Sequence, residues 1–264
     1  MARISVLMGV YNCAAYLQQA LDSLYAQTCQ DFKIILCDDG SSDDTYAIAG
    51  ENAAVHSNIV LLQNDKNLGL NATLNRCLEY ADTEFCARMD GDDISLPARF
   101  EAELKFLDGH PQYAIVSAPM LYFDEGGVFR TGKGGGEPRV KDFPKGTPFC
   151  HAPCMVRTEA YKAVGGYSVS DKLLRVEDYH LWIKMYAKGY RGYMLDEPLY
   201  MMRDDRSALH RRNLRSRLNE ARVKAIAIRT FRLPVWEYIY CLKPVILGLM
   251  PAGLYSRLRK AANG

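Results

Sequence analysis

The chain has 264 residues, of which 48% are hydrophobic and 24% are charged. This composition supplies enough apolar surface for one large or two smaller domains, and it excludes a disordered chain. The formal net charge of +2 excludes a general binder of polyanions. It hides an asymmetry, because residues 203–264 hold 14 Lys and Arg but four Asp and Glu. That stretch carries +10 and residues 1–202 carry −8, which predicts two surfaces with two kinds of partner.

Eight cysteines are scattered along the chain, and no apolar leader precedes the first strand-like run at residues 4–8. We therefore expect a cytoplasmic protein whose cysteines are reduced and mostly pack as small apolar side chains. Cys150, His151 and Cys154 leave zinc as an alternative, although a second ligand pair at usable spacing is missing.

Strand and helix patterns alternate in the first third of the chain. Apolar runs predict strands at residues 4–8, 32–37, 59–62 and 84–88, and helical periodicity predicts helices at 16–25, 43–55 and 70–80. Ser42 or Asp43 is expected to cap the second of these helices. Such alternation predicts a mostly parallel α/β sheet with helices on both faces. Its ligand is expected beyond the carboxyl ends of the strands.

The second half of the chain is less regular. The patterns predict a helix from Pro97 to about 107, strands at 113–117 and 120–123, a glycine-rich loop or hairpin at 126–136, a helix at 176–188 and a strand at 191–202. The glycine-rich segment lacks the lysine and the strand-to-helix context of a phosphate-binding loop. Beyond residue 203 the chain is expected to be helical and basic.

Two acidic segments follow predicted strand ends. The turn Asp90-Gly91-Asp92-Asp93 brings together three carboxylates, whose repulsion a cation would relieve, and such oxygen ligands suit Mg²⁺ or Mn²⁺ on a diphosphate. Asp38 and Asp39 end another strand, where a carboxylate can accept a hydrogen bond from a base or ribose. Alternatively, these segments are solvated turns that begin helices. Their places on neighbouring strands favour a nucleotide diphosphate site.

The order of several motifs resembles one enzyme family. Residues 6–12 (VLMGVYN), 38–45 (DDGSSDDT), 67–70 (NLGL) and 89–93 (MDGDD), followed by Gly165-Gly166-Tyr167 and Glu177-Asp178, are similar to the inverting family 2 glycosyltransferases of GT-A fold. The resemblance covers about residues 3–205. It implies a GT-A catalytic domain at 1–205, with a nucleotide-sugar half at 1–95 and an acceptor half at 96–205, and a basic helical extension at 206–264.

The resemblance also implies a role for each matching residue. The donor nucleotide would be bound by Val10, Tyr11, Asn12, Asp38, Asp39, Asn67, Gly69, Arg76, Asp90 and Gly91. Asp92 would hold Mg²⁺ or Mn²⁺ on the donor diphosphate, and Asp178 would be the general base. An acceptor-side group would comprise His151, Gly166, Tyr167, Glu177, Trp182, Arg203 and Arg206.

Within the acceptor-side group the expectations differ. Trp182 is expected to pack in the core rather than to stack on a sugar, and His151 either touches a phosphate or acceptor or is hydrogen-bonded in a loop. Arg203 and Arg206 could clamp the diphosphate bidentately. Relatives often carry a His near this point, whereas this chain has Asp204-Asp205-Arg206.

The implied reaction is a displacement at the anomeric carbon. One carboxylate takes the proton of the acceptor hydroxyl, and a metal ion neutralises the leaving diphosphate. Asp178 begins a predicted helix, whose dipole is expected to keep it ionised. The Gln-x-x-Arg-Trp segment of processive relatives is absent, since Leu181-Trp182 stands there, and no membrane-spanning run is present. Single-sugar addition is therefore expected.

The basic extension suggests a membrane surface. The uncharged run at residues 244–256 is too short to span a bilayer, and it lies between Lys243 and a basic cluster, with aromatic residues upstream. That pattern is typical of a helix lying in the membrane interface. Alternatively, the helices cap the catalytic domain or form a homodimer contact. Nucleic acid is not expected, because a recognisable reading module is missing.

These observations predict a metal-dependent enzyme that transfers one sugar from a nucleotide-diphosphate sugar, by default a UDP-sugar. The expected acceptor is a lipid-linked or membrane-associated glycan at the inner face of the membrane, as in O-antigen, capsule or exopolysaccharide synthesis. One alternative is a sugar nucleotidyltransferase, which would need a basic glycine-rich loop where residues 9–12 read GVYN. The other is a non-catalytic membrane-docking scaffold.

Overall fold

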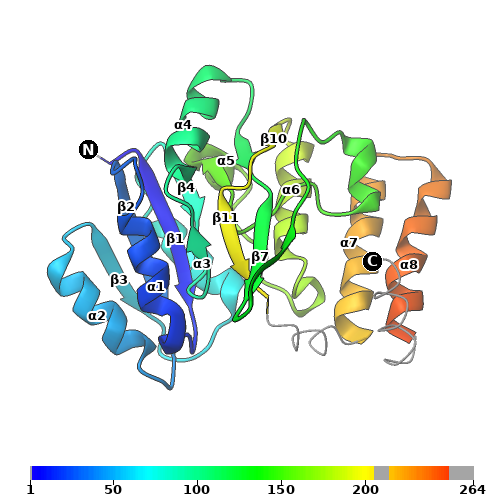
Figure 1. The fold of residues 1–264 in the computed structure, drawn as a ribbon. Coiled ribbons are helices and arrows are strands. Elements are labelled where there is room, and N and C mark those ends of the chain that lie inside the picture. The colour runs from blue at the N-terminus through cyan, green and yellow to red at the C-terminus, as the bar shows by residue number, and fades with distance from the viewer. Residues whose placement is uncertain (1, 205–213, 250–264) are drawn as a thin grey trace.

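A seven-stranded sheet forms the centre of the molecule (Figure 1). The structure, a computed structural model, describes residues 2–204 and 214–249. The strands lie in the order β10-β6-β9-β4-β1-β2-β3, and β9 alone runs antiparallel to its neighbours. They are β1 (Ile4–Val10), β2 (Phe32–Asp38), β3 (Ile59–Gln63), β4 (Phe85–Arg88), β6 (Ile115–Ser117), β9 (Met155–Arg157) and β10 (Gly192–Met194). The prediction of a mostly parallel α/β sheet is confirmed.

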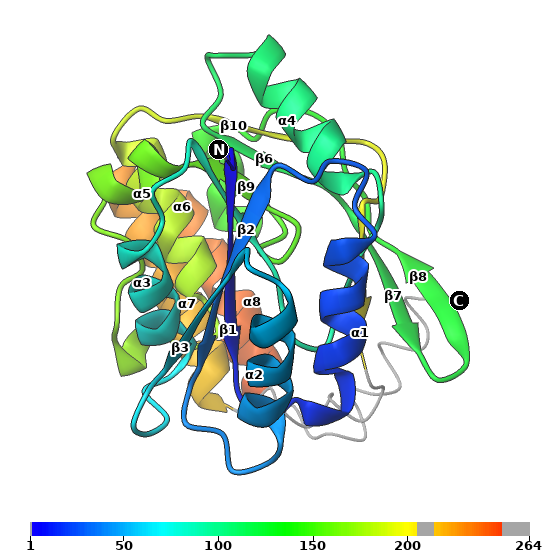
Figure 2. The same cartoon turned by 90° about the vertical axis from the view of Figure 1, so that its left-hand side faces the viewer.

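Helices cover both faces of this sheet (Figure 2). One face packs on α1 (Ala14–Tyr25), α2 (Thr45–Val55) and α4 (Arg99–Gly109), and the other on α3 (Leu70–Glu79), α5 (Thr158–Ala163) and α6 (Glu177–Ala187). Successive side chains of a strand point to opposite faces. Val6 and Met8 of β1 accordingly join the cluster with α1, whereas Leu7 joins the cluster with α3. This two-sided burial explains why the strands are continuously apolar.

Helix α2 begins two residues later than predicted. Neither Ser42 nor Asp43 is its N-cap, because the helix starts at Thr45 after Asp44. The Asp43 carboxylate instead accepts hydrogen bonds from the amides of Ala14 and Thr45, each at 3.1 Å. It thereby ties the starts of α1 and α2 to each other.

A second sheet was not predicted. It contains β5 (Ile94–Ser95), β11 (Tyr200–Arg203), β7 (Met120–Asp124) and β8 (Gly127–Thr131), in the order β5-β11-β7-β8. The glycine-rich segment is a hairpin, in which β8 pairs with β7. The single strand predicted at 191–202 is wrong: it is divided into β10 and β11, which belong to different sheets. Pro198 between them has no amide proton to donate to a ladder, which favours the break.

The C-terminal segment is helical, as predicted, and contains α7 (Leu214–Thr230), the 3₁₀ helix η4 (Val235–Tyr238) and α8 (Ile239–Leu249). Val223 and Ala227 of α7 belong to the hydrophobic cluster that also contains α6. The buried Lys224 ammonium donates a 2.8 Å hydrogen bond to the Pro144 carbonyl. Helix α7 therefore packs on α6 and on the segment that contains Pro144. Within residues 2–204 and 214–249, no helix is long and apolar enough to cross a bilayer.

A fully buried ion pair joins α4 to the centre of the sheet. Arg99 and Glu103 are both inaccessible to solvent, and their side chains lie 3.3 Å apart. Arg99 also donates to the carbonyl of Arg88 at 2.9 Å and to those of Ala152 and Cys154 at 3.3 Å. Burial raises the pKa of Glu103 to about 7, against the effect of Arg99. This pair thus links α4, the end of β4 and the segment before β9.

We expect Glu103→Ala to lower the free energy of unfolding by about 3–5 kcal/mol, because it leaves the Arg99 charge buried without its carboxylate. Urea unfolding, followed by the fluorescence of buried Trp182, measures the change. Lys105→Ala, at an exposed position of the same helix, is the control and should change stability by less than about 0.5 kcal/mol. Equal effects of the two substitutions would contradict the role of the pair.

Candidate active site

The carboxyl ends of β1, β2 and β4 meet at one edge of the sheet. Val10 pairs with Asp38 in the parallel register, and the Asp39 amide donates to the Val10 carbonyl at 2.8 Å. The Asn64 amide donates to the Asp38 carbonyl, also at 2.8 Å, and Met89 follows β4 beside Leu7. The two acidic segments that follow predicted strand ends therefore lie at the same edge of the sheet as the segments after β1 and β3.

Asp39 organises the loop that leads into α3. Its Oδ1 accepts hydrogen bonds from Asn64 Nδ2 at 2.7 Å and the Leu68 amide at 2.9 Å, and its Oδ2 accepts from the Gly69 amide at 2.9 Å. Asn67 Oδ1 also accepts from that amide, at 3.1 Å. Gly69 has φ +86, in the left-handed region that favours glycine. Both oxygens of Asp39 are therefore committed to the protein.

Asp38 accepts hydrogen bonds from the described residues through one of its two carboxylate oxygens. This fully buried carboxylate accepts from the Ser41 amide at 3.1 Å and from Gln63 Nε2 at 3.3 Å, in both cases through Oδ2. Its Oδ1 is buried without a hydrogen-bond partner in the described part of the chain. An unpaired buried carboxylate oxygen is costly, which favours Asp38 over Asp39 as the acceptor for a base or ribose.

Arg76, which was expected to contact the donor, donates hydrogen bonds to the end of β3. Its Nη1 donates to the Gln63 carbonyl at 2.5 Å and to Asn64 Oδ1 at 2.6 Å. It thereby fixes the end of β3, where Gln63 and Asn64 also contact Asp38 and Asp39. Arg76 thereby stabilises the segment whose side chains contact Asp38 and Asp39.

The loop after β1 is held against the loop after β2. Asn12 has a left-handed φ of 48, its amide donates to Ser41 Oγ at 3.0 Å, and its Oδ1 accepts from the Ser42 amide at 2.8 Å. Beside it, a Cβ atom on Gly91 would lie 2.9 Å from Cγ1 of Val10, which explains the glycine there. Tyr11 stays 48% exposed. Its ring is accessible to a ligand at this edge.

The three carboxylates of the acidic turn have different surroundings. Asp90 pairs with Arg88, which is 2% exposed, at 2.5 Å, and Asp93 accepts from the Arg203 amide at 2.8 Å. Burial raises the pKa of Asp93, and the charges of Asp90 and Asp92 raise it further. The pKa of Asp92 is raised by loss of solvation and by Asp90. Among the described residues, no hydrogen bond from another residue reaches the side chain of Asp92, which is exposed.

Asp92 fits a divalent metal bound mainly by phosphates. In residues 2–204 and 214–249, no group of three or more His, Cys, Asp or Glu side chains is arranged to hold a metal ion. Mg²⁺ usually keeps several waters and takes one or two carboxylates together with substrate phosphates. One accessible carboxylate beside two others, already engaged, satisfies that requirement. The donor set is hard oxygen, as Mg²⁺ and Mn²⁺ prefer.

The guanidinium of Arg203 is already engaged by the protein, whereas bidentate binding of a diphosphate requires free N–H donors. Its Nε donates to the Asp92 carbonyl at 3.1 Å, its Nη2 donates to Gln19 Oε1 at 2.9 Å, and its guanidinium lies 4.1 Å from the centroid of the Tyr16 ring. These contacts attach β11 to the acidic turn. Arg206 lies outside the described residues.

Asp178 lies at the start of α6, as predicted, but its environment corrects one expectation. Burial raises the pKa of Asp178 to about 7, and the neighbouring Glu177 charge acts in the same direction. The helix amides of Tyr179 and Asp178 lower it, yet desolvation outweighs them. Burial also raises the pKa of Glu177, whose Oε2 has no partner among the described residues. The helix start therefore does not by itself keep Asp178 ionised.

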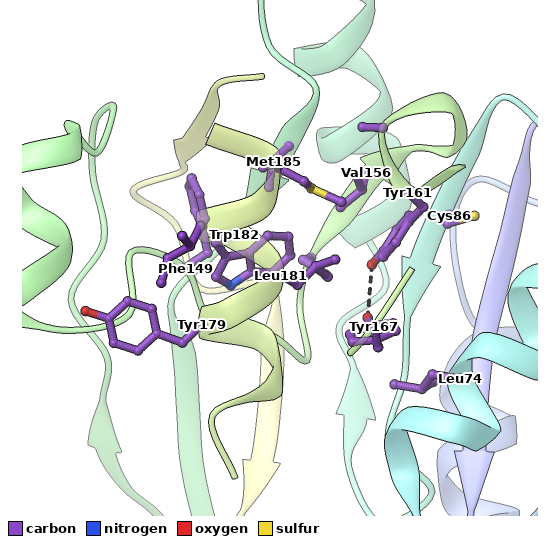
Figure 3. Packing of buried hydrophobic residues seen from close by; sticks show 14 of the residues in the cluster. Leu74, Cys86, Phe149, Val156, Tyr161, Tyr167, Tyr179, Leu181, Trp182 and Met185 are labelled. Carbon is purple, nitrogen blue, oxygen red and sulfur yellow. Dashed lines mark hydrogen bonds between the residues drawn. The ribbon is translucent and has the colours of Figure 1, made fainter. Parts of the chain in front are cut away.

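Aromatic side chains from α6 and neighbouring segments pack together in the core (Figure 3). Trp182 is fully buried against Phe149, with ring centroids 5.5 Å apart, so the expected core role of Trp182 is confirmed. His151 Nε2 lies 2.8 Å from the Tyr167 hydroxyl, which lies 3.1 Å from that of Tyr161. Burial, followed by the charge of Arg88, lowers the pKa of His151 well below its usual value. His151 is therefore neutral and hydrogen-bonded to Tyr167.

The Gly166-Tyr167 turn is attached to α3. Gly166 has φ +63, and Asn75 exchanges two hydrogen bonds with the backbone of Tyr167, at 2.7 and 2.8 Å. The turn thus fixes the tyrosine that contacts His151. Both Gly166 and Tyr167 are buried.

Sequence reasoning missed a cavity beside Asp178. It has a volume of about 380 Å³ and is lined by Gly146, Thr147, Arg175, Val176, Asp178, Tyr179 and, from α7, Ser216, Arg217 and Glu220. Arg88 was also missed, although a cation ending an apolar strand directly before three acids was a usable signal. No local pattern marks Arg175 or the α7 residues, because only the tertiary fold brings them to Asp178.

Comparison with known proteins identifies the family. Residues 5–165 match the family model for Glycosyl transferase family 2. The chain belongs to this family. It is 40% identical over 259 residues to the putative glycosyltransferase EpsE of Bacillus subtilis, covering 98% of this chain and 93% of that protein. It is also 26% identical over 192 residues to the Escherichia coli UDP-Glc:alpha-D-GlcNAc-diphosphoundecaprenol beta-1,3-glucosyltransferase WfaP, covering 73% of each.

Solved structures confirm the GT-A fold of this glycosyltransferase. S. aureus TarS 1–349 in complex with UDP-GlcNAc has a TM-score of 0.70 at 20% identity, over 94% of this chain and 72% of that one. The mannosyltransferase PcManGT of Pyrobaculum calidifontis, in complex with GDP-Man and Mn²⁺, has a TM-score of 0.69 at 19% identity, over 98% and 79%. At these identities the likeness concerns the fold.

Proposed function

We propose that this glycosyltransferase adds a single sugar, with inversion, from a UDP-sugar to a hydroxyl of a lipid-linked glycan. The observation that carries the proposal is the position of Asp178, a half-buried carboxylate at the start of α6 that opens on a cavity. Burial sets its pKa to about 7, where a general base works best at neutral pH. The acceptor named for WfaP and the UDP-GlcNAc bound by TarS support the substrate classes.

The residues divide the reaction between them. Asp38 accepts a hydrogen bond from the nucleoside, Tyr11 borders it, and Asp92 holds Mg²⁺ or Mn²⁺. The metal, when bound, neutralises the charge of the leaving diphosphate. The acceptor oxygen bonds to the anomeric carbon as the bond to the diphosphate oxygen breaks, and Asp178 takes the hydroxyl proton. Burial raises the pKa of both Asp92 and Asp178, and the charge of Arg88 partly opposes that rise in each, so Arg88 acts on both halves of the site.

The two alternatives are less well supported. A sugar nucleotidyltransferase needs cations in the loop after the first strand, whereas residues 9–12 contain none. A scaffold without catalytic activity does not explain the cavity at Asp178 or the unpaired oxygen of Asp38.

Asp178→Asn is expected to reduce transfer by about 10²–10⁴-fold, because the amide cannot accept the proton. In the wild type, kcat/KM should fall about tenfold per pH unit below pH 7, since only ionised Asp178 accepts the proton. The assay measures release of UDP from a panel of UDP-sugars with a synthetic GlcNAc-diphosphoryl alkyl lipid.

Glu159→Gln removes an exposed carboxylate on α5 that has no hydrogen-bond or ion-pair partner among the described residues, and it serves as the control, with transfer close to that of the wild type. Binding of UDP, measured by calorimetry, should be the same in both variants. Full transfer by Asp178→Asn would show that the base has been assigned to the wrong residue.

For the metal, we expect UDP and Mn²⁺ together to raise the melting temperature of the wild type more than UDP alone does, because ligands that bind only the folded state stabilise it. Asp92→Asn should abolish the additional Mn²⁺-dependent shift. The exposed Asp65→Asn variant, in the loop before α3, should retain it. The metal assignment fails if Asp92→Asn responds to Mn²⁺ as the wild type does.

We further propose that the extension at 206–264 binds the cytoplasmic face of the membrane. Six apolar side chains form a stripe on η4 and α8, each between 56% and 79% exposed: Val235, Trp236, Ile239, Leu242, Ile246 and Leu249. Their spacing of three or four residues places those on α8 on one helix face. Residues 214–249 hold seven Lys and Arg against two Glu, which favours an anionic lipid surface over a second copy of this basic segment.

Trp236→Glu combined with Ile246→Glu is expected to weaken co-sedimentation with 3:1 phosphatidylcholine:phosphatidylglycerol vesicles by more than about tenfold, through lost apolar burial. Val55→Glu is the control, because Val55 is 76% exposed at the far end of α2. Transfer to a water-soluble acceptor should persist in both. Unchanged vesicle binding would refute the proposal, as would a dimer in the wild type that this double variant converts to a monomer.

A further inference from the structure

The cavity beside Asp178 joins the catalytic region to the C-terminal extension. Its floor comes from the start of α6 and from Gly146 and Thr147, and its opposite wall comes from Ser216, Arg217 and Glu220 of α7. Helix α7 is fixed there by the buried side chains of Val223 and Ala227. The cavity is thus formed by packed elements on both sides. Its volume of about 380 Å³ lies in the usual range of small-molecule sites, about 300–1,000 Å³.

Arg175 supplies this cavity with a cation that the protein does not neutralise. Among the described residues no hydrogen-bond or ion-pair partner of its side chain is found, whereas Arg217 pairs with Glu220 at 3.3 Å. Arg175 also has φ 66, an uncommon conformation for a residue that is not glycine. Such strain persists where surrounding structure imposes it, and it is frequent at ligand sites.

We propose that this cavity binds the acceptor, with Arg175 recognising a phosphate group next to the acceptor sugar and α7 forming one wall. This inference rests on the proposed function. A guanidinium binds phosphate through two parallel hydrogen bonds, which fixes orientation as well as position. An acceptor held in this way carries its sugar hydroxyl to Asp178, three residues further along the chain.

The donor diphosphate has a different place. The residues that line the cavity include none from the loops after β1, β2 or β4, where Asp38 and Asp92 lie. Asp178 is the lining residue that the mechanism requires, and it acts on the acceptor hydroxyl rather than on the leaving group. The cavity therefore belongs to the acceptor side of the reaction.

The experiment compares two acceptors in the full-length enzyme: a GlcNAc-diphosphoryl alkyl lipid and the uncharged alkyl glycoside of GlcNAc with the same chain. The wild type should use the diphosphate acceptor about 10–100-fold better in kcat/KM, as charge-assisted hydrogen bonds imply. Arg175→Gln should erase this preference by raising KM for the charged acceptor. Its KM for the donor and its slow hydrolysis of donor without acceptor should stay unchanged.

Arg175→Lys should recover part of the preference, because it restores the charge without the planar fork. Lys172→Ala removes an exposed cation three residues away that does not line the cavity, and it should leave both acceptors unaffected. Ser216→Trp tests the wall from α7: it should raise KM for both acceptors while donor hydrolysis persists.

The outcomes separate this inference from the proposed function. If the wild type neither transfers nor hydrolyses any nucleotide sugar, the proposed function fails. If it transfers normally and Arg175→Gln keeps the full preference for the diphosphate acceptor, the inference alone is overturned. A rise in donor KM with unchanged acceptor KM would also overturn it, because the cavity would then serve the donor.

Discussion

The buried guanidinium of Arg88 is the interaction on which the site depends. It ends the central strand β4 and pairs with Asp90 at 2.5 Å. Burial raises the pKa of Asp92, Glu177 and Asp178, and the charge of Arg88 partly opposes that rise. Carboxylates from two distant parts of the chain would otherwise repel one another in a poorly solvated space. A buried cation at this point lets the acidic turn and the start of α6 approach each other. Arg99 stabilises the position of Arg88 by donating a hydrogen bond to the Arg88 carbonyl.

The fold could be predicted where regular periodicity carries the information. Strands β1 to β4 and the helices between them follow their patterns within about two residues, because β1, β2 and β4 are buried on both faces and β3 is a continuous apolar run. The second sheet could not be found in this way. Strand β5 has two residues, β9 in the main sheet has three, and their partners are remote in sequence. Their pairing depends on tertiary contacts rather than on local propensity.

The candidate site was predictable for a topological reason. Parallel strands bring their carboxyl ends to one edge, so polar segments after Val10, Asp38 and Arg88 had to meet. The division of labour among them was not predictable. Asp38 and Asp39 are adjacent and chemically identical, yet one orders a loop and the other keeps a free oxygen. The protonation of Asp178 likewise depends on burial, which no sequence motif records.

The close contact of α7 with α8 has a geometric consequence. A Cβ atom on Gly248 would lie 3.0 Å from Leu214 and 3.1 Å from Arg217, so the two helices touch backbone to side chain next to the cavity. This contact links the apolar stripe on α8 to the wall of the Asp178 cavity on α7. We propose that the stripe lies on a bilayer, and the packing of α8 on α7 would then set the distance between that bilayer and Asp178. The enzyme would then select acceptors by the distance between their reactive hydroxyl and the lipid surface.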